Sequence, residues 1–106
     1  MIRIVQLTFQ PTYTEAFLNH FEKVKDQINA FPGCRGMQLL QDENNPTIFF
    51  TYSEWDSESD LENYRRSELF RGIWPHVKPW FAQKAKAWST DTIFNGFEKK
   101  QSQSKA

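Results

Sequence analysis

The sequence lacks the cysteines that stabilise many small domains or bind zinc in them. Cys34 is the only cysteine among 106 residues, so the chain has no internal disulfide and no cysteine pair of the kind that ligates zinc. A chain of this length still has room for one ordinary hydrophobic core. A lone cysteine is typical of a reducing compartment, and we expect the protein in the cytoplasm.

Long apolar runs and an excess of charge are missing as well. No run approaches the ~18 apolar residues of a membrane-spanning helix, and residues 1–20 do not show the basic start and apolar stretch of a secretion signal. Thirteen Lys and Arg balance thirteen Asp and Glu, which removes the long-range field that draws proteins to nucleic acid or anionic lipid. We therefore expect no nucleic-acid partner and no membrane association.

The familiar motifs of catalysis are also absent. The chain has only four glycines, and they do not form a glycine-rich loop for a dinucleotide or a phosphate. A GxSxG nucleophile turn, a HExxH zinc motif and an acidic calcium loop are missing too. The sequence therefore predicts no metal site and no bound cofactor.

Aromatic side chains are what the sequence has in abundance. Ten Phe, four Trp and three Tyr make up 16% of the residues. Each ring buries roughly 150 to 250 Å², so a few of them can stabilise a small domain. We expect a core built from rings, with some rings lining a cavity. With so much filler, the helices could also collapse onto the sheet and leave no cavity.

The first third of the chain has the pattern of a strand followed by a helix. Residues 2–9 carry apolar side chains on both parities, which favours a strand covered on both faces. Thr12 and Glu15 have the spacing of a capping box, so we expect a helix to begin there and to end at Pro32. Its apolar stripe repeats every three or four residues and consists of Phe17, Phe21, Val24, Ile28 and Phe31.

A hairpin, further helices and a last strand should follow. Residues 36–41 and 47–55 flank a polar turn, which predicts two paired strands. Ser57 has the spacing to cap a second helix and Ser67 to start it again, while Pro75 and Pro79 should break this segment into short pieces. Residues 83–94 alternate like a strand, and residues 95–106 form a polar tail that we expect to be disordered.

This element order predicts the fold class. Strand-helix-strand-strand-helix-strand is the α+β, ferredoxin-like βαββαβ arrangement, here in one domain over residues 1–94, with helices on one face of a four-stranded antiparallel sheet. Strand side chains on the opposite face are also bulky and apolar, and monomers rarely leave such a face bare. We therefore expect a homodimer in which two sheet faces pack together.

Three polar residues are candidates for chemistry. His76 lies between two tryptophans and can act as an acid or base near neutral pH, although a half-exposed histidine at a helix end is the simpler interpretation. Tyr64 either packs in the core or turns its hydroxyl into a pocket. Gln6 interrupts an apolar strand and so needs a hydrogen-bond partner or a wet cavity. His20 is off the apolar stripe and should face solvent, and Arg65 should be solvated.

Three segments of the chain resemble the antibiotic biosynthesis monooxygenase family of dimeric α/β-barrel proteins. They are residues 2–21, the turn Phe-Pro-Gly-Cys-Arg-Gly-Met at residues 31–37, and the step Tyr-Ser-Glu-Trp-Asp-Ser at residues 52–57 that leads to residues 64–70. The resemblance covers about residues 1–94. It implies a homodimer whose sheets close into a barrel, with a pocket between the helices and the sheet of each protomer.

The resemblance also implies a choice of activities. Some members of the family oxygenate aromatic polyketides without flavin or metal, and others degrade haem. In the haem-degrading branch a strand Asn, a helix Trp and a His that ligates iron form the site, and these positions hold Gln6, Tyr64 and Trp74 here. Because all three depart from the pattern, haem degradation is the weaker alternative.

We therefore expect a monooxygenase without cofactor that acts on a hydrophobic, aromatic or quinol-type small molecule. Gln6 and Tyr64 would donate hydrogen bonds to the substrate, and His76 would act as the base or as a proton relay. A non-enzymatic dimer that holds a small metabolite, or that serves in a stress response, is the other alternative. The wall around the substrate would consist of Phe21, Trp55, Phe70 and Trp74.

Overall fold

Four strands form one antiparallel sheet in the order β2-β3-β1-β4. The structure is a computed structural model, and it describes residues 1–98. The strands are β1 (Ile2–Thr8), β2 (Cys34–Gln41), β3 (Ile48–Trp55) and β4 (Lys86–Thr90). This sheet confirms the predicted α+β, ferredoxin-like fold and the hairpin between the second and third strands.

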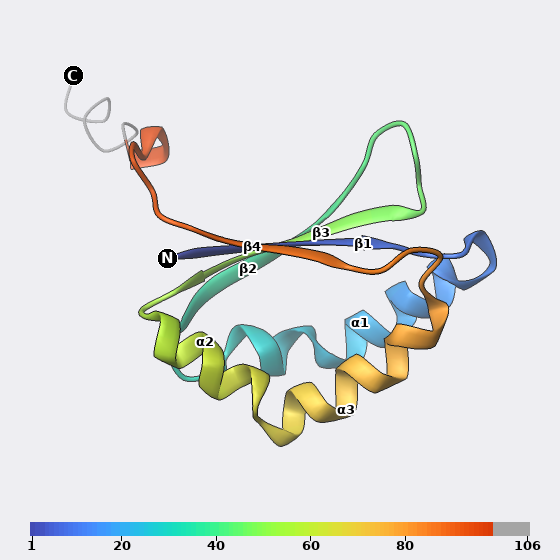
Figure 1. The fold of residues 1–106 in the computed structure, drawn as a ribbon, viewed down its shortest axis with the longest axis horizontal. Helices are drawn as coiled ribbons and strands as arrows, with labels where there is room; N and C mark the ends of the chain where they lie inside the picture. The colour runs from blue at the N-terminus through green and yellow to red at the C-terminus, as the bar shows by residue number, and fades with distance from the viewer. Residues whose placement is uncertain (99–106) are drawn as a thin grey trace.

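All the α-helices lie on one face of the sheet (Figure 1). They are α1 (Thr14–Asn29), α2 (Glu58–Arg65) and α3 (Glu68–Val77). Short 3₁₀ turns join or extend them, namely η1 (Pro11–Tyr13), η2 (Lys78–Trp80) and η3 (Gly96–Glu98). Of the tail predicted to be disordered, residues 99–106 lie outside the described residues.

Both predicted serine caps are confirmed. The Ser57 hydroxyl accepts a hydrogen bond from the backbone N–H of Asp60 at 3.1 Å and begins α2. The Ser67 hydroxyl accepts from the backbone N–H of Phe70 at 3.1 Å and begins α3. These local bonds satisfy N–H groups that a helix start would otherwise leave free.

The start of α1 differs from the prediction. Thr12 does not cap a helix, because it lies inside η1, and α1 begins two residues later at Thr14 without a side-chain cap. Pro11 occupies the first turn of η1, where its fixed φ suits a tight turn and its missing N–H costs nothing. The capping-box prediction was therefore wrong.

Pro75 does not break the third helix, which was also predicted wrongly. α3 runs through Pro75 to Val77. Val77 is 2% exposed, and packing of this apolar end holds the helix together. Pro79 does fall at a break, since it lies at the start of η2, where a proline is well tolerated.

The last strand is shorter than the predicted residues 83–94. β4 pairs with β1 alone, from Gln6 opposite Lys86 to Ile2 opposite Thr90. Beyond Thr90 there is no further residue of β1 to pair with, because β1 begins at Ile2. The length of the neighbouring strand, and not the alternation of side chains, ends β4.

The core is made of rings, as predicted. Phe9, Phe17 and Phe49 are each at most 4% exposed. The Phe9 and Phe17 rings stack with centroids 4.3 Å apart, and Phe49 meets Phe17 edge-on at 5.2 Å. Leu7 and Val77 complete the cluster. The cluster joins α1 and α3 to the sheet, and Leu7, Phe17 and Val77 also border the cavity described next.

Candidate functional site

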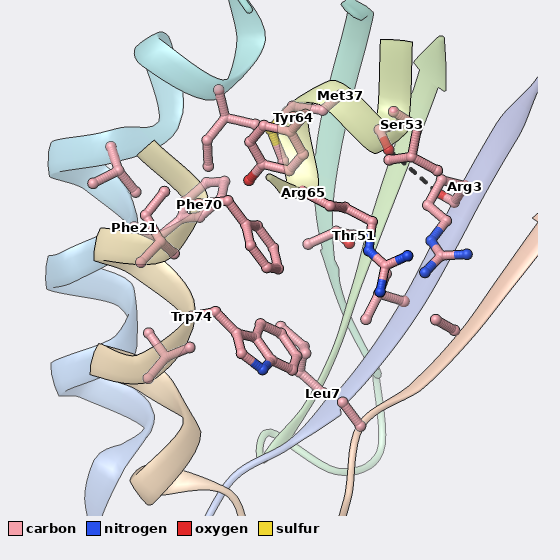
Figure 2. Close-up of a pocket in the computed structure, with 18 of the residues that line it drawn as sticks. Arg3, Leu7, Phe21, Met37, Thr51, Ser53, Tyr64, Arg65, Phe70 and Trp74 are labelled. Carbon is pink, nitrogen blue, oxygen red and sulfur yellow. Dashed lines mark hydrogen bonds between the residues drawn. The ribbon is translucent and has the colours of Figure 1, made fainter. Parts of the chain in front are cut away.

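A cavity of about 420 Å³ lies between the helices and the inner face of the sheet (Figure 2). Small-molecule sites in proteins commonly have volumes of about 300 to 1,000 Å³. The cavity is mostly apolar, with a few polar side chains at the sheet. It is lined by Arg3, Val5, Leu7, Phe17, His20, Phe21, Val24, Ile28, Met37, Thr51, Ser53, Trp55, Leu61, Tyr64, Arg65, Phe70, Ile73, Trp74, Val77, Ala85 and Ala87.

The four predicted wall residues all border this cavity, namely Phe21, Trp55, Phe70 and Trp74. The rings of Phe70 and Trp74 stack at 5.7 Å, one helical turn apart on α3. Figure 2 shows both projecting from the helix toward the sheet. The two near-parallel rings form an apolar wall of the cavity, against which another ring can pack.

Tyr64 also borders the cavity, from α2. Burial raises the pKa of Tyr64 to about 12, with a smaller electrostatic contribution from the neighbouring Cys34. The hydroxyl is therefore protonated at neutral pH and can donate a hydrogen bond. Figure 2 shows this oxygen turned into the space that Phe70 borders. Tyr64 is thus placed to donate a hydrogen bond to a bound molecule. It cannot serve as a base at neutral pH, because its phenolate form is not populated there.

His20 was predicted to face solvent, and this is wrong. It follows Phe17 by three residues and precedes Val24 by four, so it shares their side of α1 and lines the cavity. Its Nε2 atom is buried and has no hydrogen-bond partner among residues 1–98. Burial lowers the pKa of His20, and the charges of His76 and Lys23 lower it further. The ring is therefore neutral near pH 7 and able to accept a proton.

His76 stacks on His20 and does not line the cavity. It is exposed on α3, and its ring stacks on that of His20 with centroids 4.3 Å apart. Trp80 packs edge-on against it at 5.1 Å. Between the two histidines, His20 is the one with access to a bound molecule, and the sequence offered a signal in its helical spacing from Phe17.

Gln6 is not brought to the cavity either. Side chains of a strand point alternately to its two faces, and Val5 and Leu7 on either side of Gln6 line the cavity. Gln6 lies opposite Phe50 and Lys86 on the outer face of the sheet. Both parities of residues 2–9 are apolar, so the sequence did not reveal which parity faces the helices.

Two arginines border the cavity, which was not predicted from the sequence; Arg65 was predicted only to be solvated, and its side chain is indeed 50% exposed. Arg3 shares the inward parity of Val5 and Leu7, and Arg65 is the last residue of α2. Ser53, which is 8% exposed, lies beside them and accepts a hydrogen bond from the indole N–H of Trp55 at 2.9 Å. The polar groups of the cavity therefore gather where β1, β3 and the end of α2 meet.

The residues at the haem-binding positions of the resemblance do not fit that group. The position of the iron ligand holds Trp74, whose indole nitrogen is a donor only and cannot ligate iron. His76, two residues further on, is exposed and outside the cavity lining. Within residues 1–98, no three His, Cys, Asp or Glu side chains gather to hold a metal ion.

The same residues, 1–98, contain no helix of the length and apolar character that crossing a membrane requires.

The fold and the cavity define a class, that of small ferredoxin-like domains that enclose an apolar cavity under their helices. The sequence profile of the antibiotic biosynthesis monooxygenase family matches residues 1–74. The chain belongs to this family, as the resemblance predicted.

Solved structures support the same fold. A Nitrosomonas europaea protein assigned as an antibiotic biosynthesis monooxygenase superposes with a TM-score of 0.82 at 22% identity, over 88% of this chain and 98% of that one. Rv0793 from Mycobacterium tuberculosis superposes with a TM-score of 0.81 at 14% identity, over 90% and 96% of the two chains. At such identities the likeness establishes the fold alone.

Two curated relatives match part of the chain. The 42.8 kDa protein in the whiE locus of Streptomyces coelicolor is 33% identical over 54 residues, which is 51% of this chain and 14% of that protein. The protein rrnAC3100 of Haloarcula marismortui, assigned as heme-binding, is 32% identical over 63 residues, or 59% of this chain and 9% of that protein. The chain thus spans only a small share of the length of either relative.

Proposed function

We propose that the protein is a monooxygenase that needs no cofactor and acts on an aromatic, quinol-type small molecule in the cavity. Family membership supports this class of reaction, and the stacked rings of Phe70 and Trp74 suit a flat substrate. One observation carries the proposal: the buried, unpartnered Nε2 of His20 and the protonated hydroxyl of Tyr64 border the same apolar cavity. A base and a donor in a water-poor site are what this chemistry requires.

The reaction draws its electrons from the substrate alone. His20 Nε2 takes a proton from a quinol hydroxyl, and Tyr64 donates a hydrogen bond to the oxyanion that forms. This electron-rich anion passes one electron to O₂, and the radical and superoxide combine through a new C–O bond. The peroxide anion that results takes back the proton held by His20 and becomes a hydroperoxide. The O–O bond then breaks with loss of water, so one oxygen atom stays on the substrate and the other leaves in water.

We also propose that the chain forms a homodimer through the outer face of the sheet. The helices lie on the opposite face (Figure 1). Leu40 and Trp88, whose strand positions place them on the outer face, are 44% and 46% exposed. Ile4 lies between Trp88 and Tyr52 in the sheet, which makes the apolar surface continuous across three strands. A second copy offers the matching surface.

Oxygen uptake with 1,4-dihydroxynaphthalene tests the proposed reaction. We expect consumption of one O₂ per molecule and a 2-hydroxy-1,4-naphthoquinone product that carries one ¹⁸O atom when ¹⁸O₂ is supplied. His20→Gln should slow this by about 100-fold, since positioned bases commonly contribute at least that much. Tyr64→Phe should slow it by about tenfold, because it removes one hydrogen bond to an anion.

The same variants distinguish the alternatives. His76→Gln tests the assignment made from the sequence: if this change stops turnover while His20→Gln does not, the base is His76. A wild-type protein that binds the quinol but consumes no oxygen above the rate in buffer would instead be a carrier of small molecules.

A further inference from the structure

Arg3 and Arg65 converge on one corner of the cavity. Arg3 extends from β1, and Arg65 extends from the C-terminal end of α2. Both line the cavity, and Figure 2 shows their guanidinium groups next to each other, below Ser53 in this view. Two cations therefore meet where the apolar wall ends.

The described residues provide little negative charge for these two cations. Arg3 donates a hydrogen bond to the Ser89 hydroxyl at 2.9 Å, and no carboxylate of residues 1–98 is within ion-pair distance of it. Glu62 pairs with Arg65 at 3.4 Å through one carboxylate oxygen, while its other oxygen is bound by Arg66 at 3.2 Å. Among the described residues, Glu62 is thus shared by Arg65 and Arg66, and Arg3 has no carboxylate partner.

The guanidinium groups of Arg3 and Arg65 repel each other, although the Arg65 side chain is 50% exposed. Burial lowers the pKa of Arg3, and the charge of Arg65 lowers it further, while Glu62 only partly compensates. Both arginines stay charged at neutral pH, because a guanidinium does not lose its proton in that range. An anion between them would remove the repulsion and accept several charge-assisted hydrogen bonds.

We propose that the cavity takes an aromatic carboxylate, with its carboxylate between Arg3 and Arg65 and its ring against Phe70 and Trp74. The planar forks of two guanidinium groups match the two oxygens of a carboxylate. The inference rests on the proposed function in using the same cavity, and it narrows the substrate class to hydroxylated aromatic acids.

Calorimetric titration with 2-naphthoate and with its methyl ester tests this binding site. The two probes share a ring system, but only the first is charged. We expect 2-naphthoate to bind at least about tenfold more tightly than the ester, and this preference to shrink as salt is added, since part of it is electrostatic.

Arg65 and its neighbour Arg66 provide a matched pair of variants. Each lies at the end of α2, each pairs with Glu62, and each change to Gln removes one positive charge, but only Arg65 lines the cavity. Arg65→Gln should weaken 2-naphthoate binding about tenfold, and Arg66→Gln by less than about twofold. Arg3→Gln should act like Arg65→Gln. Arg3→Lys, which keeps the charge but loses the planar fork, should weaken binding less than Arg3→Gln does, and it serves as the second variant if Arg3→Gln disturbs folding.

The outcomes separate this inference from the proposed function. If acid and ester bind equally well, the arginines are not a carboxylate site, but the cavity still binds aromatic molecules. If Arg66→Gln weakens binding as much as Arg65→Gln, the attraction belongs to the surface of α2, and the inference is wrong. If neither probe binds at millimolar concentration, both the carboxylate site and the aromatic cavity site are overturned. Oxygen uptake does not enter any of these readouts.

Discussion

Gly33 links the end of the first helix to the second strand in a conformation that other residues rarely adopt. Its φ is +88°, and a Cβ atom at this position would collide with the side chain of Asp60. The backbone N–H of Asp56 also donates to the Gly33 carbonyl at 2.8 Å. The turn therefore ties the end of β3 and the start of α2 to the region where the cavity begins, and it allows no side chain.

A glycine-to-alanine pair tests this constraint. Gly33→Ala should lower the free energy of unfolding by more than about 1 kcal/mol, because the left-handed region alone costs roughly that much and the collision with Asp60 adds to it. Gly72→Ala is the control: it lies in α3 with open space around the added methyl group, and it should raise stability by about 0.5 to 1 kcal/mol. Urea denaturation measures both, and equal effects at the two sites would contradict this account.

Single residues also show where prediction from sequence succeeds and fails. Ser57 and Ser67 could be predicted as caps because a cap depends on the next three residues alone. Gln6 and Arg3 could not be assigned to the correct face, because that depends on which parity of the strand meets helices from elsewhere in the chain. The position of His20 at the cavity could have been predicted, because its spacing from Phe17 and Val24 places it on the apolar side of its helix.

At the scale of elements, the stacked rings of His20 and His76 join α1 to α3. Two imidazolium rings at a centroid distance of 4.3 Å repel each other. The pKa of His20 lies below its ordinary value of 6.5 because of burial, with His76 and Lys23 adding to the effect. The unfolded chain therefore binds this proton more readily than the folded protein does, and acid should loosen the contact between the two helices.

Because the pKa of His20 is lower in the folded protein than in the unfolded chain, the stability of the protein should fall with acid. The contribution of His20 to stability is complete above pH 6.5 and is lost as the pH falls through the lower pKa of the folded state. The melting temperature should fall between pH 7.5 and 5.5, and His20→Gln should flatten this fall. His76→Gln should flatten it in part, because it removes the neighbouring charge. The sequence has only two histidines, so the double variant should show the smallest change.

Thermal melts followed by circular dichroism in this pH range make the comparison. A His20→Gln protein that loses stability with acid as steeply as the wild type would show that the histidine contact does not couple α1 and α3.

The elements themselves could be predicted in order and type, but not in all their limits. Pro75 was predicted to end its helix because proline is disfavoured inside helices. The packing of the buried Val77 end of α3 outweighs that cost. The end of β4 was missed because it depends on the first residue of β1, far away in sequence. Both errors arise where tertiary contacts override local preference.

At the scale of the whole molecule, the helices within residues 1–98 cover one face of the sheet and leave the other face bare of helices. Figure 1 shows the chain after β4 running away from the sheet on the side opposite the helices. That segment carries Ile93, Phe94 and Phe97, which are 97%, 85% and 85% exposed. Exposed apolar side chains on both the outer face and this segment leave a large surface that favours association. The proposed homodimer would cover the outer face with an equivalent surface.

Changing two residues of the outer face tests the dimer. Leu40→Glu with Trp88→Glu places a charge on β2 and on β4, so each copy would bury two unpaired carboxylates against its partner, and we expect the sedimenting mass to fall to one chain of 12.6 kDa. Leu18→Glu is the matched control, because Leu18 is 41% exposed on α1, away from the sheet face, and it should leave a species of twice that mass. A wild-type chain that sediments as a monomer at micromolar concentration would exclude this dimer.

Because His20, Tyr64, Arg3 and Arg65 all belong to one chain, a monomeric double variant should still bind 2-naphthoate, and loss of that binding would mean that the cavity depends on the partner copy.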